Sequence, residues 1–202
     1  SNFNTARGDS FANMFKGCEQ LTNLDLTSFM ATNATNMSGM FQDCTRLALV
    51  SFPDDLNSTK VNNLSHMFQN CVAMETVDLN AINVRSVTDV TSLFENCTAL
   101  TEVDINRWSF NTNGSNVTSD KMFYNCEKLV SIYVGENWMV RSGNTQVSPL
   151  KGTDTFWGCT AIVGAAPDSR YDTANSATAG AATHGFVGPN GYLCAKSRWG
   201  GA

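Results

Sequence analysis

A Phe-x-x-Cys tetrapeptide recurs six times along this chain of 202 residues, and its period constrains the fold more than any other feature. Successive cysteines lie 26, 27, 26, 29 and 33 residues apart. A unit of this size cannot bury its own apolar side chains, so it must stack on the units before and after it. The copies are Phe15–Cys18, Phe41–Cys44, Phe68–Cys71, Phe94–Cys97, Phe123–Cys126 and Phe156–Cys159. The repeat therefore predicts one solenoid.

An apolar pattern of the form Cys-x-x-Leu-x-x-Leu-x-Leu follows each cysteine. In the fourth unit its apolar positions are Leu100, Val103 and Ile105. The last two apolar residues are spaced by two, which is typical of a short strand with one buried face. Because every unit carries such a strand at the same place, the strands are predicted to form a parallel sheet along one side of the solenoid.

Upstream of each Phe the apolar spacing changes to that of a helix. Val87, Val90, Leu93 and Phe94 fall at i, i+3, i+6 and i+7, which is one stripe of a helix surface. Ser86 is the residue type expected at the N-cap of that helix. We therefore predict an α/β repeat solenoid, with a parallel sheet on one side and short helices on the other.

The repeat resembles a known family. The segment 87–100 reads Val-Thr-Asp-Val-Thr-Ser-Leu-Phe-Glu-Asn-Cys-Thr-Ala-Leu, and it is similar to the BspA-like leucine-rich repeats of bacterial surface proteins. The resemblance covers residues 11–162, in six copies that keep one register. It implies a leucine-rich-repeat fold in a bacterial protein at the cell surface or secreted, which binds macromolecules of a host or of neighbouring cells.

The repeat pattern divides the chain into two parts. Residues 1–162 are predicted to form the solenoid, in which the segment 140–150 lengthens the last turn. Residues 163–202 are rich in Gly and Ala and lack the apolar stripe, so we expect a C-terminal cap. Residues 1–14 match the second half of a unit. We therefore expect that the N-terminus is truncated and that an anchor or secretion signal lies outside this chain.

Composition excludes two classes of partner. The 13 basic and 18 acidic side chains give a net charge of −5, whereas nucleic acids and anionic membranes are bound by basic faces. No run of 18 apolar residues is present, so no segment is predicted to span a membrane.

Six of the seven cysteines occupy one repeat position, which predicts a column of buried thiols. Their separation across stacked turns would permit disulfides, but stacked side chains point the same way, so we expect free thiols. Cys194 lies outside the pattern and is left unassigned. No Cys-x-x-Cys pair occurs, and we expect no metal site and no cofactor. The same argument predicts that Met14, Phe41, Phe68, Phe94 and Phe123 are buried.

No constellation of catalytic residues is visible. The two histidines are His66 and His184, and His66 stands where other units carry Gly39 and Ser92, so we expect it to face solvent. Nucleophilic catalysis needs one activated thiol beside a base, and no repeat cysteine departs from its column. The sequence therefore predicts that the protein is not an enzyme.

One surface remains as a candidate for binding. In each strand the residue between the apolar positions points out of the sheet, as does the residue two places before it. These outward residues are Asn23, Asp25, Leu49, Ser51, Thr76, Asp78, Glu102, Asp104, Ser131 and Tyr133.

Four of the outward residues, Asp78, Glu102, Asp104 and Tyr133, are predicted to form the binding site. Like charges on strands about 5 Å apart repel one another, and a basic partner or a bound cation would relieve that repulsion. Tyr133 adds an aromatic residue of the kind enriched at interfaces.

Three functions fit these features. The first is an adhesion module that binds an extracellular protein or glycan. The second is a structural spacer that holds another domain away from the cell, and the third is an enzyme whose site lies in a missing N-terminal part. A binding face would differ chemically from the opposite face, whereas a spacer would be featureless on both.

Overall fold

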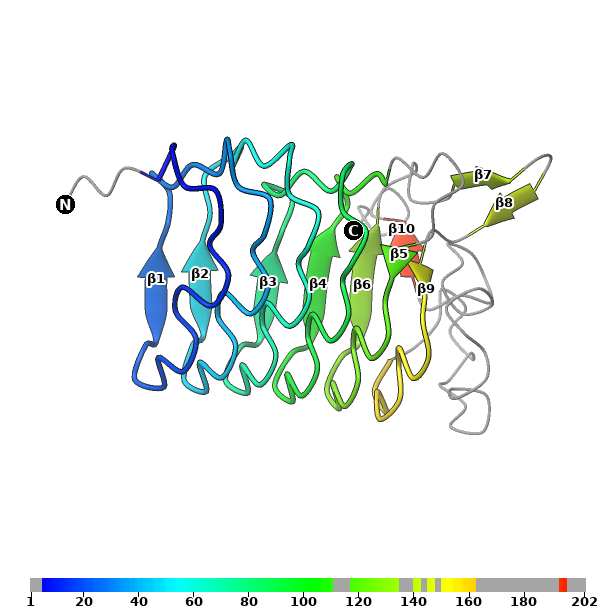
Figure 1. The fold of residues 1–202 in the computed structure, drawn as a ribbon. Helices are drawn as coiled ribbons and strands as arrows, with labels where there is room; N and C mark the ends of the chain where they lie inside the picture. The colour runs from blue at the N-terminus through cyan, green and yellow to red at the C-terminus, as the bar shows by residue number, and fades with distance from the viewer. Residues whose placement is uncertain are drawn as a thin grey trace, which may run out of the picture.

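The computed structural model describes residues 5–110, 117–134, 140–142, 145–147, 150–162 and 193–195. The chain runs through successive turns that stack on one another (Figure 1). The strands are β1 (Asn23–Asp25), β2 (Leu49–Ser51), β3 (Thr76–Asp78), β4 (Glu102–Ile105), β5 (Val117–Thr118), β6 (Ser131–Val134), β7 (Val140–Ser142), β8 (Thr145–Val147), β9 (Leu150–Lys151) and β10 (Leu193–Ala195).

The predicted parallel strands are confirmed. Strands β3, β4, β6 and β10 form a parallel sheet in the order β10-β6-β4-β3, and β1 pairs with β2 in parallel. Strands β1, β2, β3, β4 and β6 lie side by side in one layer (Figure 1), although no ladder joins β2 to β3. Strands β1, β2, β3, β4 and β6 each begin one residue before the Leu-x-Leu part of the pattern, whereas β5 and β7 to β10 were not predicted by it.

A second line of parallel pairing runs along the stack. Ser10, Asn36, Asn63, Asp89 and Thr118 are joined in that order by single parallel bridges. Strand β5 continues this line by pairing in parallel with β9. Neighbouring turns are therefore joined both at the sheet and along this second line, except that the turns of β2 and β3 lack the pairing at the sheet.

The expected short helices are not found among the described residues, where the segments before each Phe form chains of tight turns. Within one turn, the Met40 N–H donates to the Met37 carbonyl, three residues earlier, at 3.3 Å. The next N–H, that of Phe41, instead donates to the Met67 carbonyl of the following turn at 2.9 Å. Backbone bonds thus alternate between one turn and the next, whereas a helix makes all of them internally.

Left-handed backbone at two positions in every unit explains why no helix forms. In the fourth unit, Ser92 has a φ of 54° and Asn96 a φ of 62°, and an α-helix needs right-handed values throughout. The position before the repeat cysteine has positive φ in every unit, and its residues are Gly17, Asp43, Asn70, Asn96, Asn125 and Gly158. Gly, Asn and Asp tolerate this conformation best. Apolar residues three positions apart fit both a helix and a series of turns, so this spacing alone does not distinguish the two.

Side chains at equivalent positions form columns along the stack. The six repeat phenylalanines stack ring on ring, with centroids 5.2 to 5.6 Å apart and interplanar angles of 0° to 19°. Phe41, Phe68, Phe94 and Phe123 are buried as predicted. Trp108 is also buried, and its indole N–H donates to the Leu79 carbonyl at 3.0 Å.

Two residues of the first turn were predicted to be buried and are not. Met14 is half-buried and Cys18 is exposed. A side chain in a column is buried by the equivalent residues on both sides. Within the described residues, Phe15 of this turn stacks on one ring only, that of Phe41. The prediction treated all six units as interior ones.

Side-chain amides form a polar column beside the phenylalanines. The Asn125 amide donates to Asn96 at 3.1 Å, Asn96 donates to Asn70 at 2.9 Å, and Asn70 donates to the Asp43 carboxylate at 2.6 Å. These are the same residues that adopt left-handed backbone before the cysteines. One residue type therefore meets a conformational need and a hydrogen-bonding need together.

The C-terminal part is described only at β10, which extends the sheet beside β6. Apart from these residues, the cap predicted for 163–202 lies outside the described residues. In the segment 140–150, which was predicted to lengthen the last turn, β7 and β8 pair in antiparallel fashion.

Truncating an interior ring should cost more than truncating the first one. Phe68→Ala is expected to lower the free energy of unfolding by about 3–5 kcal/mol, because the ring is fully buried between two others. Phe15→Ala should cost clearly less, because Phe15 is half-buried. Urea unfolding followed by circular dichroism measures both. Equal losses would contradict the stacking account.

Candidate functional site

The outward face of the sheet brings the four predicted binding residues together. Asp78 on β3 lies directly opposite Asp104 on β4, and Asp104 lies opposite Tyr133 on β6. Glu102 lies two residues before Asp104 on the same strand. Asp78 and Glu102 are exposed, while Asp104 and Tyr133 are half-buried. The predicted register and orientation of these residues are thus found in the structure.

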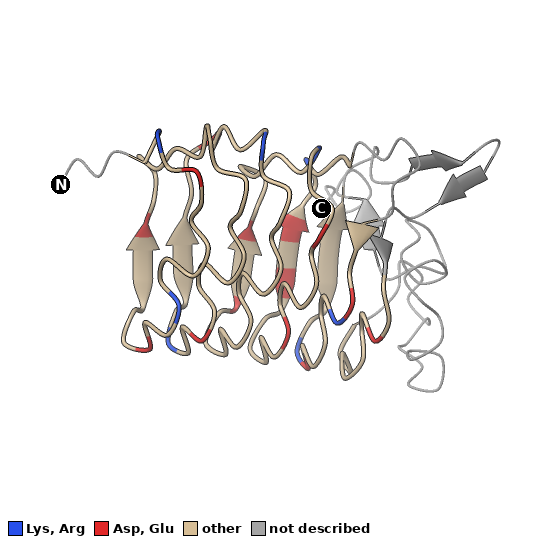
Figure 2. Ribbon diagram, viewed as in Figure 1, with Lys and Arg blue, Asp and Glu red and all other residues tan. Residues whose placement is uncertain are grey.

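The acidic residues are not spread evenly over the sheet. Strands β1, β3 and β4 carry carboxylates, whereas β2 and β6 carry none (Figure 2). On β2 the outward position of Leu49 is apolar and 52% exposed. The face therefore changes from an acidic part on β3 and β4 to uncharged strands on either side.

The strand aspartates close the turns that follow their strands. The Asp78 carboxylate accepts the backbone N–H of Asn80 at 2.8 Å, and Asp104 accepts that of Asn106 at 3.1 Å. Asp25 does the same for Thr27 at 2.9 Å. This backbone bond, followed by a bond from the Thr27 hydroxyl, holds the pKa of Asp25 below its usual value. Such turns are common at Asp and Asn, whose side chains reach the backbone two residues on.

Asp104 is the centre of a small network between β3 and β4. Its Oδ1 accepts the side-chain amides of Asn80 at 2.9 Å and Asn106 at 2.5 Å, in addition to the backbone bond. The side-chain oxygen of Asn80, Oδ1, in turn accepts a hydrogen bond from the backbone N–H of Arg107 at 2.7 Å. These bonds fix the loops after β3 and β4 relative to each other.

Tyr133 and Glu102 form a pair across β4 and β6. The Tyr133 hydroxyl donates to the Glu102 carboxylate at 3.2 Å. The bond holds the phenol over the sheet beside the acidic residues. An aromatic ring and a carboxylate are thereby presented together on an exposed face.

The structure weakens one premise of the sequence argument. Repulsion between the carboxylates implied a bound partner, but Asp78 and Asp104 each have a structural role in their loops. The signal was present in the sequence as Asp-x-Asn at residues 78–80 and 104–106. The alternating strand pattern concerns only the apolar positions on either side of each Asp, so it does not predict the turn that the carboxylate closes.

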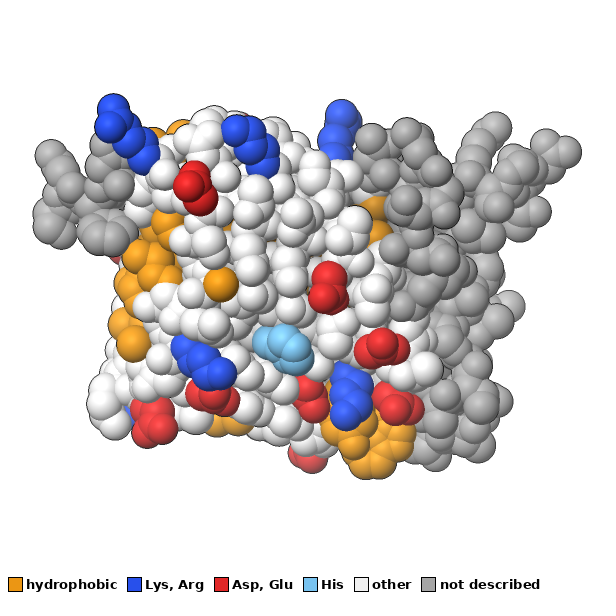
Figure 3. Space-filling view, viewed as in Figure 1, with side chains coloured by type: hydrophobic (Ala, Val, Ile, Leu, Met, Phe, Trp, Pro, Cys, Tyr) orange, Lys and Arg blue, Asp and Glu red, His pale blue; other side chains and the backbone are white. Residues whose placement is uncertain are grey.

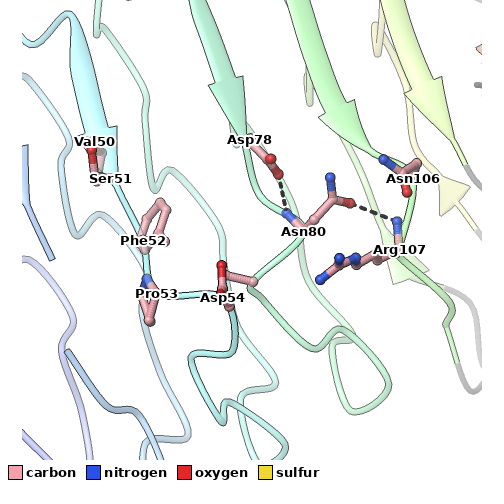
Figure 4. A pocket seen from close by; sticks show the side chains of 10 residues that line it. Val50, Ser51, Phe52, Pro53, Asp54, Asp78, Asn80, Asn106 and Arg107 are labelled. Atoms are coloured by element: carbon pink, nitrogen blue, oxygen red, sulfur yellow. Dashed lines mark hydrogen bonds between the residues drawn. The ribbon is translucent and has the colours of Figure 1, made fainter. Parts of the chain in front are cut away.

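Asp78 also lines a hollow that the sequence did not predict. The hollow has a volume of about 520 Å³ and lies at the carboxyl ends of β2, β3 and β4 (Figure 4). Its walls include Phe52, Asp54, Asn106 and Arg107. The sequence feature that corresponds to this hollow is one extra residue between Cys44 and Cys71, which lie 27 residues apart rather than 26.

The repeat thiols are held in an environment that suppresses reactivity. In each of the last five units the thiol donates to the carbonyl of the Phe one unit earlier, and the donors are Cys44, Cys71, Cys97, Cys126 and Cys159, at 2.9 to 3.2 Å. All six repeat cysteines are free. Burial raises the pKa of Cys44 to about 11 and that of Cys97 to about 12. Because the thiolate is the nucleophile, these residues are poor candidates for catalysis.

His66 is less exposed than predicted. The side chain is half-buried, and its Nδ1 is buried without a hydrogen-bond partner in the described part of the chain. The residue has a φ of 59°, the left-handed conformation that Gly39 and Ser92 adopt at the equivalent position of their units. The expectation of a solvent-facing residue was therefore only partly right.

The opposite face of the molecule differs from the sheet. Red acidic and blue basic side chains are scattered over it among uncharged ones, together with the pale-blue histidine (Figure 3). Over the described ranges, no three His, Cys, Asp or Glu side chains are grouped so as to hold a metal ion. In the same ranges there is no helix long and apolar enough to cross a membrane.

One of the comparisons with known proteins gives a match. A family model described as the BspA type leucine-rich repeat region matches residues 11–144, in six copies. No curated protein and no solved structure matches the chain. The match spans the first five Phe-x-x-Cys units, from Phe15–Cys18 to Phe123–Cys126, and ends before the sixth at Phe156–Cys159.

Alkylation should separate Cys18 from the buried thiols. Iodoacetamide at pH 8 is expected to modify Cys18 rapidly and Cys44 and Cys97 slowly, and raising the pH to 9.5 should leave both buried thiols neutral. Peptide mass mapping assigns the sites. In denaturant without reductant all six repeat cysteines should be labelled. Unlabelled repeat cysteines in that sample would reveal disulfides and contradict the structure.

Substitutions at Asp104 should separate its hydrogen-bonding role from its charge. Asp104→Ala removes the acceptor of three hydrogen bonds and should lower the free energy of unfolding by roughly 1–3 kcal/mol. Asp104→Asn keeps an acceptor oxygen and should cost clearly less. The exposed Asp54→Ala serves as control, with an expected change within about 0.5 kcal/mol. Urea unfolding tests this, and equal costs for Ala and Asn would refute it.

Proposed function

Because the chain belongs to the BspA-type leucine-rich repeat family, we propose that it is a cell-surface interaction module. Repeats of this type are surface repeats associated with protein interaction. In this proposal the module is a solenoid that binds an extracellular macromolecule of a host or neighbouring cell. The contact is made by the outward face of the sheet around Asp78, Glu102, Asp104 and Tyr133.

The observation that carries the proposal is the pairing of Tyr133 with Glu102 on an exposed acidic face. Tyr supplies a large contact area with little loss of side-chain freedom, and it is enriched at the centres of interfaces. The neighbouring carboxylates give the face a negative potential that attracts a basic partner. Asp78 and Asp104 add to this potential while they close their loops.

The alternative is a spacer that presents another domain. A spacer has no need for two chemically different faces, whereas here β1, β3 and β4 carry carboxylates and no basic side chain, and the opposite face carries charges of both signs (Figures 2 and 3). The single sign of charge on the strands favours binding of a basic partner there. A stack in which each turn contacts only the adjacent turns would nevertheless also suit a spacer.

The proposal includes a bacterial surface or secreted location and excludes catalysis. Family membership supports the location, because BspA-type repeats are typically found in surface proteins. The buried, neutral thiols and the structural roles of Asp78 and Asp104 support a role in binding rather than chemistry.

The test is a binding panel of extracellular-matrix proteins and mucins, probed with the wild type and the variant Asp78→Asn/Asp104→Asn/Tyr133→Ala. Asn retains an acceptor for the loop bonds, so the variant removes charge and the ring while the turns remain closed. We expect the variant to bind a partner at least tenfold more weakly. Binding of the wild type should weaken as salt rises.

Asp43→Asn/Asp120→Asn is the matched control, since it removes two carboxylates away from the sheet and should leave binding unchanged. If the sheet variant binds a partner as well as the wild type does, the sheet is not the site. If no panel member binds the wild type and two copies in tandem still place a fused reporter at a fixed distance, the spacer is the better account.

A further inference from the structure

The hollow beside the sheet originates from one additional residue. In other units, two residues lie between the last apolar residue of the Leu-x-Leu pattern and the next apolar residue. Examples are Leu79 to Ile82 and Ile105 to Trp108. Three residues, beginning with Pro53, separate Phe52 from Leu56. The longer loop coincides with the place where no ladder joins β2 to β3. The hollow opens between this loop and the loops after β3 and β4.

The hollow has the size of a ligand site and continues into a second one. Its volume of about 520 Å³ lies within the roughly 300–1,000 Å³ typical of ligand pockets. A second hollow of about 380 Å³ shares Asp54, Asn80 and Arg107 with it. Together they form a groove, here called the loop groove, that crosses the loops after β2, β3 and β4.

Charges of both signs face the loop groove. The Arg107 side chain extends across the first hollow toward the side that carries Asp54 (Figure 4). Among the described residues no ion pair engages either group, so both are available to a ligand. Asp55 and Arg85 line the second hollow and add one charge of each sign. A ligand with a strong charge of either sign would therefore meet repulsion as well as attraction.

The wall on the β2 side is flat and apolar. Phe52 and Pro53 are both half-buried and line the first hollow opposite Asn80 and Arg107 (Figure 4). The Asn80 amide is fixed, because it donates to Asp104 and accepts from the Arg107 backbone. The groove therefore offers one apolar wall, and a second wall of oriented polar groups.

We propose that the loop groove binds a neutral sugar unit of a glycan. Each sugar hydroxyl can donate to a carboxylate such as Asp54 and accept from a guanidinium such as that of Arg107. The opposite charges are then satisfied by one uncharged ligand. The apolar face of the sugar ring rests against Phe52 and Pro53. The second hollow accommodates the next sugar of the chain.

This site extends the proposed function and is independent of the sheet face. Asp54, Phe52 and Arg107 do not belong to the sheet residues proposed above, although Asp78 borders both regions. A protein partner on the sheet and a sugar in the groove could thus be bound together, as on a glycosylated protein. Either site can fail while the other is retained.

The experiment uses an array of defined neutral and sialylated oligosaccharides, followed by calorimetry with the best neutral one. Arg107→Ala and Asp54→Ala should each weaken binding at least about tenfold, because each removes a charge-assisted hydrogen bond. Phe52→Leu should also weaken sugar binding, because it removes the flat ring while it keeps most of the apolar volume. Deletion of Pro53 restores the spacing of the other units and should abolish binding.

Two controls keep the outcome clear. Arg46→Ala removes an exposed arginine away from the groove and should leave binding unchanged. Glu102→Gln/Tyr133→Ala alters only the sheet and should also leave sugar binding unchanged, whatever it does to a protein partner. The proposal is overturned if the wild type binds no neutral oligosaccharide. It is also overturned if Arg107→Ala and Asp54→Ala leave sugar binding unchanged, or if the groove captures a peptide in place of sugar.

Discussion

Each unit of this protein contributes one phenylalanine whose ring lies almost parallel to that of the next unit, 5.2 to 5.6 Å away. Hydrogen-bonded strands lie about 4.8 Å apart, so the backbone spacing and the ring spacing can be satisfied together only if the rings are offset. Every other column is subject to the same spacing. A side chain that suits one unit must therefore suit the copies above and below it.

The columns explain which features could be predicted from sequence. Register, strand position and burial follow from residues that recur, so Phe68, Cys97 and Val103 were placed correctly. The turns were mistaken for helices because apolar spacing of three is common to both. The recurrent Gly or Asn before the cysteine, as at Gly17 and Asn70, held the missing information about left-handed backbone. Errors at Met14 and Cys18 arose because burial depends on two neighbours, which a pattern within one unit does not reveal.

The candidate site was only partly predictable for a different reason. Repetition placed Asp78, Asp104 and Tyr133 on one face, but it did not show that the carboxylates bind the loops that follow. The loop groove depends on Pro53, a departure from the repeat rather than a part of it. In a repetitive chain, departures of this kind carry information about individual sites, while the repeat itself describes the scaffold.

The amide column from Asn125 to Asp43 has a direction, since each amide donates toward the N-terminal end of the stack. An asparagine can be reversed, exchanging donor and acceptor, so a column of asparagines alone could run either way. The Asp43 carboxylate cannot donate when it is ionised. It therefore acts as a terminus that orients every amide behind it, and the dipoles along about four units of the stack add in one sense. A single acidic residue thus gives this column of amides a direction that the backbone ladders alone do not impose on it.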